Sequence, residues 1–187
     1  MSARLSIDQE APDFDLSSTE GALLMLRDEV PRTAVLLYFF GDPESVRVRQ
    51  DLEVLREQRP SLAKWQAKVL AVSPAKLAQL KELQAALRLP FPLLRDDRNF
   101  AAAYGVDPAA EGEDSEPALY LVDYSRIVIW MANPVASVHG AMNEIVEILK
   151  RQKSPTTNYP RSVINRLMDF WFNPTSFVNR WTNRSVD

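Results

Sequence analysis

The continuous apolar run "TAVLLYFF", residues 33–40, constrains the fold more than any other stretch of this chain. It combines β-branched and aromatic residues, and after Thr33 it lacks the alternation of apolar and polar side chains that is typical of a half-exposed strand. We expect a central strand that is buried on both faces. Such a strand requires a sheet with helices packed on both sides.

A helical pattern follows this strand. Apolar side chains recur at i, i+4 and i+7, at Val48, Leu52 and Leu55. We therefore expect a helix that begins near Ser45 and ends before Pro60, because proline interrupts the hydrogen bonds of a helix interior. Ser45 is a candidate N-cap residue, since its hydroxyl can accept a hydrogen bond from the first turn.

Strand and helix patterns continue to alternate along the rest of the domain. The expected elements are a buried strand over 68–74, a leucine-striped helix over 74–88, a short strand within 91–97, a brief helix closed by Gly105, a hairpin that turns at 123–126 and a final helix over 136–152. A small hairpin is expected earlier, around residues 14–26.

This order predicts an α/β fold with a central mixed β-sheet flanked by helices and preceded by an N-terminal β-hairpin. A chain of 187 residues suits one domain with a modest extension. We assign residues 1–152 to the domain and residues 153–187 to a C-terminal amphipathic extension.

The composition argues against several classes of function. The chain has no cysteine, which removes disulfides, thiolate nucleophiles and cysteine metal sites. His139 is the single histidine, so neither a metal site nor a histidine relay is expected, and no cofactor is predicted. The net charge of −3 does not favour a nucleic-acid partner. The start "MSARLSIDQEAPDF" has no secretory pattern, so a cytoplasmic location is expected.

Six stretches then suggest a family. They are "APDFDL", "VLLYFF", "VLAVSP", "FPLLRDDRNFAAAYGV", "PALYLVD" and "VHGAMNEIVEILK", and they occur in this order over residues 7–151. In order and spacing they resemble the peroxiredoxin family, the alkyl hydroperoxide reductase/thiol-specific antioxidant group, and its bacterioferritin-comigratory-like members in particular. The resemblance implies a thioredoxin-like fold.

The family's chemistry depends on a Pro-x-x-x-Thr/Ser-x-x-Cys motif after the first central strand. Aligned without gaps, this chain has Gly41 at the proline, Ser45 at the Thr/Ser and Val48 at the peroxidatic cysteine. The family also has an arginine at the start of the strand that reads "PALYLVD" here, and Pro117 occupies that place. The resemblance therefore implies a degenerate member without the thiolate or the guanidinium that reduces peroxide, so we predict no catalytic residues.

Three carboxylates surround the degenerate loop, at Asp42, Glu44 and Asp51. Paired carboxylates can act as general acid and base. Acidic residues in a first helical turn also complement the helix dipole, and this second interpretation is favoured.

The C-terminal segment has a charge of its own. From Arg151 onward six Lys/Arg face two Asp, a balance of +4, which leaves −7 for residues 1–150. Its apolar residues follow a helical spacing: Val163, Ile164, Leu167, Met168, Trp171 and Phe172. The candidate partner-binding residues are its large apolar and basic side chains: Leu167, Met168, Trp171, Phe172, Phe177, Trp181, Arg166 and Arg180.

Three roles for residues 154–187 are open. The segment can fold back on its own domain or on a second copy in a homo-oligomer, enter a groove of another protein, or lie on a membrane surface. We predict a non-catalytic binding or structural subunit of a protein assembly, attached through this segment. The alternatives are an antioxidant oxidoreductase whose active group is not located, and a peripheral protein of a membrane or membrane complex.

Overall fold

The computed structural model describes residues 5–106 and 116–152. The chain divides into two units, residues 1–152 and 153–187, and the described residues all belong to the first. Predictions for the C-terminal extension therefore lie outside the described residues. Within the described part of the chain, no helix has the length and apolar character needed to cross a membrane.

The described elements follow the predicted order. The strands are β1 (Asp15–Ser18), β2 (Leu23–Met25), β3 (Ala34–Phe39), β4 (Ala67–Ser73), β5 (Leu93–Arg95), β6 (Ala118–Val122) and β7 (Val128–Ala132). The helices are α1 (Leu26–Glu29), α2 (Val46–Lys64), α3 (Leu77–Leu87), the 3₁₀ helix η1 (Phe100–Tyr104) and α4 (Val138–Arg151).

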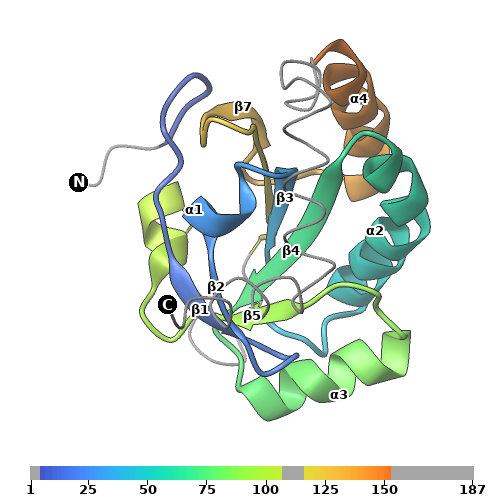
Figure 1. The fold of residues 1–187 in the computed structure, drawn as a ribbon. Coiled ribbons are helices and arrows are strands. Elements are labelled where there is room, and N and C mark those ends of the chain that lie inside the picture. The colour runs from blue at the N-terminus through green and yellow to red at the C-terminus, as the bar shows by residue number, and fades with distance from the viewer. Residues whose placement is uncertain (1–4, 107–115, 153–187) are drawn as a thin grey trace, which may run out of the picture. The chain divides into compact units, whose positions relative to one another are not determined.

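The strands form one seven-stranded sheet in the order β2-β1-β5-β4-β3-β6-β7 (Figure 1). β3, β4 and β5 are parallel, whereas β6 is antiparallel to β3, and β1 is antiparallel to β2 and β5. The mixed sheet and the N-terminal hairpin confirm the sequence predictions. The β6–β7 hairpin turns at residues 123–126, as expected, and Arg126 adopts a φ of 64° there in the absence of glycine.

The core lies on both faces of the sheet. All six residues of β3 are buried, and their side chains alternate between two clusters: Leu36 and Tyr38 join one, and Leu37 and Phe39 join the other. The first cluster includes residues of α2, α3 and α4, and the second includes residues of α1 and η1. Figure 1 shows α2 and α4 on one side of the sheet and α1 on the other. The predicted burial on both faces is therefore confirmed for residues 34–40, whereas Thr33 is half-buried.

The predicted end of α2 is wrong. The helix passes through Pro60 and ends at Lys64. A proline in a helix interior removes one backbone hydrogen bond and costs about 3 kcal/mol. Leu62 is fully buried in the core and Trp65, at the C-cap, packs against it, so the burial gained by this extra turn offsets the cost.

The turn between β5 and η1 is built around the buried carboxylate of Asp96. Its oxygens accept three backbone N–H groups, from Arg98 at 3.2 Å, Phe100 at 2.9 Å and Ala101 at 2.8 Å. These bonds satisfy donors at the start of η1 that have no partner within the helix. Asp96 thereby sets the path of the chain into η1, which Gly105 closes in the left-handed conformation, with a φ of 71°.

Candidate functional site

The loop that follows β3 is anchored to the end of β4. The N–H of Phe40 donates to the carbonyl of Val72 at 3.0 Å. The buried hydroxyl of Ser73 donates to the carbonyl of Gly41 at 2.8 Å and accepts the N–H of Ala75 at 3.2 Å. Gly41 is therefore held in a buried position directly before α2.

Ser45 occupies the N-cap position of α2, as predicted, but its side chain accepts no capping hydrogen bond. The predicted side-chain cap is therefore wrong. The first turn of α2 also carries no acidic residue, because Asp42 and Glu44 precede the helix and Asp51 lies beyond its first turn. The expected complement of the helix dipole by these carboxylates is wrong as well.

Val48 is part of the hydrophobic core. Its side chain is 2% exposed and belongs to the same cluster as Phe40 and Val135, which are also buried. Pro117 is buried at the start of β6, and its carbonyl accepts the N–H of Val135 at 2.8 Å. The connection between β7 and α4 thus bonds Val135 to Pro117 and places Val135 in the same cluster as Val48.

Arg47 ties the first turn of α2 to this same connection. Its guanidinium donates to the carbonyl of Val135 and, at 3.5 Å, to that of Ala136. The groups described here are apolar side chains, main-chain carbonyls and one guanidinium that is already engaged. None of them is a nucleophile.

The three candidate carboxylates have separate partners rather than forming a catalytic pair. Asp42 accepts the N–H of Glu44 at 2.8 Å, and Glu44 forms an ion pair with Arg49 at 2.8 Å. Asp51 accepts the hydroxyl of Tyr38 at 3.0 Å. Burial raises the pKa of the Asp51 carboxyl, against the opposing effects of the Tyr38 hydrogen bond and the Arg47 charge.

Tyr38 is the buried partner in this contact. Burial raises the pKa of its hydroxyl, and the negative charge of Asp51 raises it further. The phenol therefore stays protonated and donates to Asp51 throughout the neutral range. Among the described residues, no group of three or more His, Asp or Glu side chains is placed to hold a metal ion.

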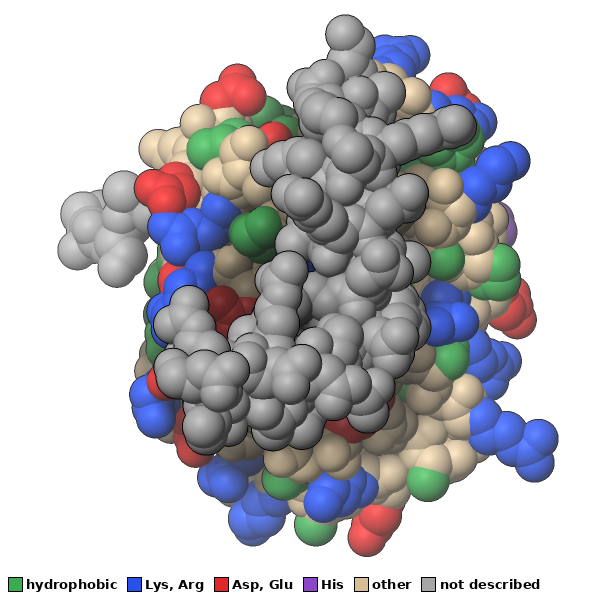
Figure 2. All heavy atoms as spheres, viewed as in Figure 1, with side chains coloured by type: hydrophobic (Ala, Val, Ile, Leu, Met, Phe, Trp, Pro, Cys, Tyr) green, Lys and Arg blue, Asp and Glu red, His purple; other side chains and the backbone are tan. Residues whose placement is uncertain are grey.

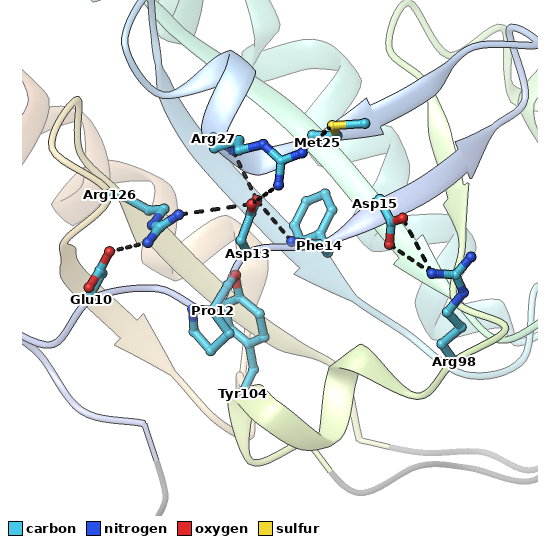
Figure 3. Close-up of polar contacts among 10 residues, drawn as sticks. All are labelled: Glu10, Pro12, Asp13, Phe14, Asp15, Met25, Arg27, Arg98, Tyr104 and Arg126. Atoms are coloured by element: carbon cyan, nitrogen blue, oxygen red, sulfur yellow. Dashed lines mark hydrogen bonds and ion pairs between the residues drawn. The ribbon is translucent and has the colours of Figure 1, made fainter.

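A second polar cluster lies on the other side of the domain, among Glu10, Asp13, Arg27 and Arg126. Figure 3 shows the carboxylate of Asp13 between the two guanidinium groups. Asp13 accepts the N–H and the guanidinium of Arg27 at 3.1 and 2.7 Å, and Arg126 lies 3.9 Å from it and pairs with Glu10. This Asp13 cluster fastens the N-terminal segment to α1 and to the turn between β6 and β7.

Tyr104 completes the attachment of the N-terminal segment, because its hydroxyl donates to the carbonyl of Pro12 at 2.5 Å (Figure 3). On the face drawn in Figure 2, acidic and basic side chains of the described residues are interspersed. The charged groups of the Asp13 cluster pair with one another within the domain, which gives the cluster a structural role, although the buried Nε of Arg126 has no hydrogen-bond partner among the described residues.

The match to a family profile decides the descent of the chain. Residues 7–131 match the AhpC/TSA family. The chain belongs to the AhpC/TSA family. This peroxiredoxin family is the one that the order of the six sequence stretches suggested.

Relatives and solved structures agree with this membership. A Coxiella burnetii protein that carries the name peroxiredoxin bcp is 27% identical over 150 residues, which cover 76% of this chain and 97% of that protein. The chloroplastic peroxiredoxin Q of Oryza sativa subsp. japonica is 25% identical over 148 residues, 79% of this chain and 68% of that protein.

Two solved structures show the fold. Peroxidoxin BcpB from Mycobacterium tuberculosis superposes with a TM-score of 0.73 at 18% identity, covering 81% of this chain and 100% of that chain. Peroxiredoxin Q of Xanthomonas campestris gives 0.65 at 22% identity, covering 73% and 89%. The domain therefore has the thioredoxin-like peroxiredoxin fold, as predicted.

Sequence reasoning did not identify Val135 or Arg47. Val135 lies in a connection without periodicity, and Arg47 is an ordinary solvent-side residue in the helical pattern. The contact between them spans 88 positions in the chain. No local sequence signal indicates it.

The Asp13 cluster gives an expected pH dependence. Burial opposes ionisation of Asp13, but hydrogen bonds from the N–H and guanidinium of Arg27 and from the N–H of Phe14 outweigh it and hold the pKa of the carboxyl below its usual range. A carboxyl whose pKa is lowered by folding stabilises the fold above its unfolded pKa of about 4 and loses that contribution as pH falls through the folded pKa.

We therefore expect the stability difference between the natural chain and Asp13→Asn to be largest near neutral pH and to shrink as the pH falls below about 4. Urea unfolding at a series of pH values measures it. Asp28→Asn, at an exposed position of α1, is the control and is expected to show no such trend. A difference that grows toward low pH would contradict the assignment.

Proposed function

We propose that this peroxiredoxin-family chain acts without thiol catalysis, as a binding or structural subunit of a protein assembly. The observation that carries the proposal is the burial of Val48. A valine that is 2% exposed stands where the family has its peroxidatic cysteine, in a chain that has no cysteine at all. Thiol peroxidases need a thiolate that peroxide can reach.

The surroundings of Val48 support this interpretation. Val135 is buried in the same hydrophobic cluster as Val48, and Arg47 binds the carbonyl of Val135. The carbonyl of Pro117 is engaged with the N–H of Val135, on the strand where the family has its arginine. These contacts support a packed arrangement around Val48 and Pro117 over an open pocket that merely lacks its nucleophile.

The second half of the proposal concerns residues 154–187. Its support is the sequence pattern: a helical stripe of large apolar residues with basic residues beside it, in a segment whose net charge is opposite to that of the rest of the chain. Trp, Phe, Met and Arg are the residue types that most often anchor protein interfaces. We therefore propose this segment as the attachment device.

The test is affinity capture from the native cell extract with the full-length chain and two sets of substitutions. Trp171→Asp together with Phe172→Asp is expected to reduce recovery of a stoichiometric partner at least about tenfold, because hot-spot side chains of this type contribute about 2 kcal/mol or more. Asn165→Ala together with Asp169→Ala changes polar residues outside the apolar stripe of the same helical pattern, and it is expected to leave recovery of the partner unchanged.

Equal recovery with both sets of substitutions would refute the attachment role. The membrane-surface alternative would be favoured if no protein partner is recovered and if liposomes retain the natural chain but not the Trp171 and Phe172 variant. Peroxide consumption by the natural chain above the reagent background would refute the first half of the proposal, since it requires a reactive group that the site does not contain.

A further inference from the structure

A cleft lies at the edge of the domain between the end of α2, the start of β4 and the connection from α3 to β5. Its volume is about 230 Å³, and the residues that line it include Leu62, Val69 and Phe91, all buried. Pro90 and Pro92 flank Phe91 on one wall. The carbonyl of Phe91 accepts the side-chain amide of Gln84 at 2.9 Å, so this wall is fixed to α3.

The opposite wall is an incomplete sheet edge. Pairing between β4 and β5 begins only at Ala71 with Leu93, although β4 itself begins at Ala67. The N–H of Ala34 donates to the carbonyl of Gln66 at 2.9 Å, which places the main-chain groups of the even-numbered residues of β4 toward β3. The main-chain groups of Ala67 and Val69 therefore point away from β3, toward the position that a neighbouring strand in line with β5 would occupy.

The segment that leads into β5 does not extend the pairing with β4. The residue that precedes Leu93 is Pro92, and a proline has no N–H to donate to the sheet. Among the described residues, Ala67 and Val69 have no strand neighbour on this side. The cleft thus combines an unpaired edge of β4 with an apolar floor.

The cleft also carries a cationic side chain that has no counter-ion among the described residues. Of its two basic lining residues, Lys68 forms an ion pair with Glu29, whereas Arg59 is exposed and has no ion-pair partner in the described ranges. A guanidinium beside hydrogen-bonding main chain and an apolar floor complements a carboxylate on a short extended backbone.

We propose that this cleft binds the C-terminal end of an extended peptide with apolar last residues. The peptide main chain pairs with Ala67 and Val69 as a short added strand, an apolar side chain lies against Pro90 and Pro92, and the terminal carboxylate binds Arg59. A strand rises roughly 3.3 Å per residue, so this edge accommodates roughly two to three peptide residues. The proposal is independent of the role of residues 154–187.

The experiment titrates the ¹⁵N-labelled full-length chain with acetyl-Ala-Leu-Val carrying a free C-terminal carboxylate. We expect dose-dependent shifts of the amide resonances of Ala67 and Val69 at millimolar peptide. Arg59→Gln is expected to weaken binding about tenfold, because it removes a charge-assisted hydrogen bond. Lys81→Gln, at an exposed position of α3 outside the cleft, is the matched control and is expected to bind like the natural chain.

A second probe isolates the carboxylate. On the natural chain, the C-terminal amide of the same peptide is expected to bind about tenfold more weakly than the free acid. On Arg59→Gln, the acid and the amide are expected to bind with equal affinity. This pattern would show that the carboxylate interacts with the Arg59 guanidinium. Unshifted Ala67 and Val69 amides, or equal affinity for acid and amide, would overturn the proposal. The same shifts with isovalerate at equal affinity would also overturn it, since they would assign the cleft to small carboxylates.

Discussion

A thiol introduced as Val48→Cys is expected to react with a soluble disulfide reagent at least about a hundredfold more slowly than a thiol introduced as Val46→Cys, because a buried group reacts only through local opening. Val48 is 2% exposed and Val46 is 70% exposed, although both residues lie in the first turn of α2. The chain has no other cysteine, so each variant reports on one site. Burial among apolar groups also raises the pKa of a thiol, which lowers its thiolate fraction.

Two further measurements sharpen this result. Adding Arg47→Ala to Val48→Cys is expected to increase the reaction rate severalfold, since it removes the tie from α2 to the carbonyl of Val135. Peroxide consumption by Val48→Cys is expected to stay at background, because Pro117 supplies no guanidinium. If Val48→Cys reacts as fast as Val46→Cys, the former pocket is open and the packed arrangement proposed for it is incorrect.

Replacing Asp96 with alanine is expected to lower the free energy of unfolding by about 2–5 kcal/mol, because it leaves three backbone donors without their charged acceptor. Those donors are the N–H groups of Arg98, Phe100 and Ala101, and the side chain that satisfies them is itself 5% exposed. Urea denaturation monitored by tryptophan fluorescence gives the value.

The neighbouring residue provides the control for this substitution. Asp97 is exposed, and Asp97→Ala is expected to change the free energy of unfolding by no more than about 0.5 kcal/mol. Asp96→Asn, which retains an acceptor oxygen, is expected to fall between the two. Equal destabilisation by Asp96→Ala and Asp97→Ala would show that the hydrogen bonds of this turn do not support the fold.

The order of the elements was predictable because it depends on local patterns. The unbroken apolar run at residues 33–40 predicted burial on both faces, and β3 is buried along its whole length. The end of α2 was not predictable in this way. The cost of Pro60 is a local property, whereas the burial of Leu62 that offsets it depends on where the last turn meets the sheet.

In the degenerate site, too, some features follow from residue identity and others only from the folded structure. The identities at Gly41, Ser45, Val48 and Pro117 are sequence information, and the absence of cysteine alone excludes a thiol nucleophile. Whether the site remained open could not be derived from those identities. The absence of a side-chain cap from Ser45 and the separate partners of the three carboxylates depend on side-chain geometry.

The sequence by itself thus determined the fold class, the family and the absence of a cysteine thiol, because apolar periodicity and residue identity are local to the chain. Only the tertiary structure decided that Val48 is buried in one cluster with Val135 and that Arg47 binds the carbonyl of Val135. It also decided that the first residues of β4 lack a strand neighbour among the described residues, beside Arg59. Those features arise where segments far apart in sequence meet, and their energies come from packing and hydrogen bonds that no local pattern encodes.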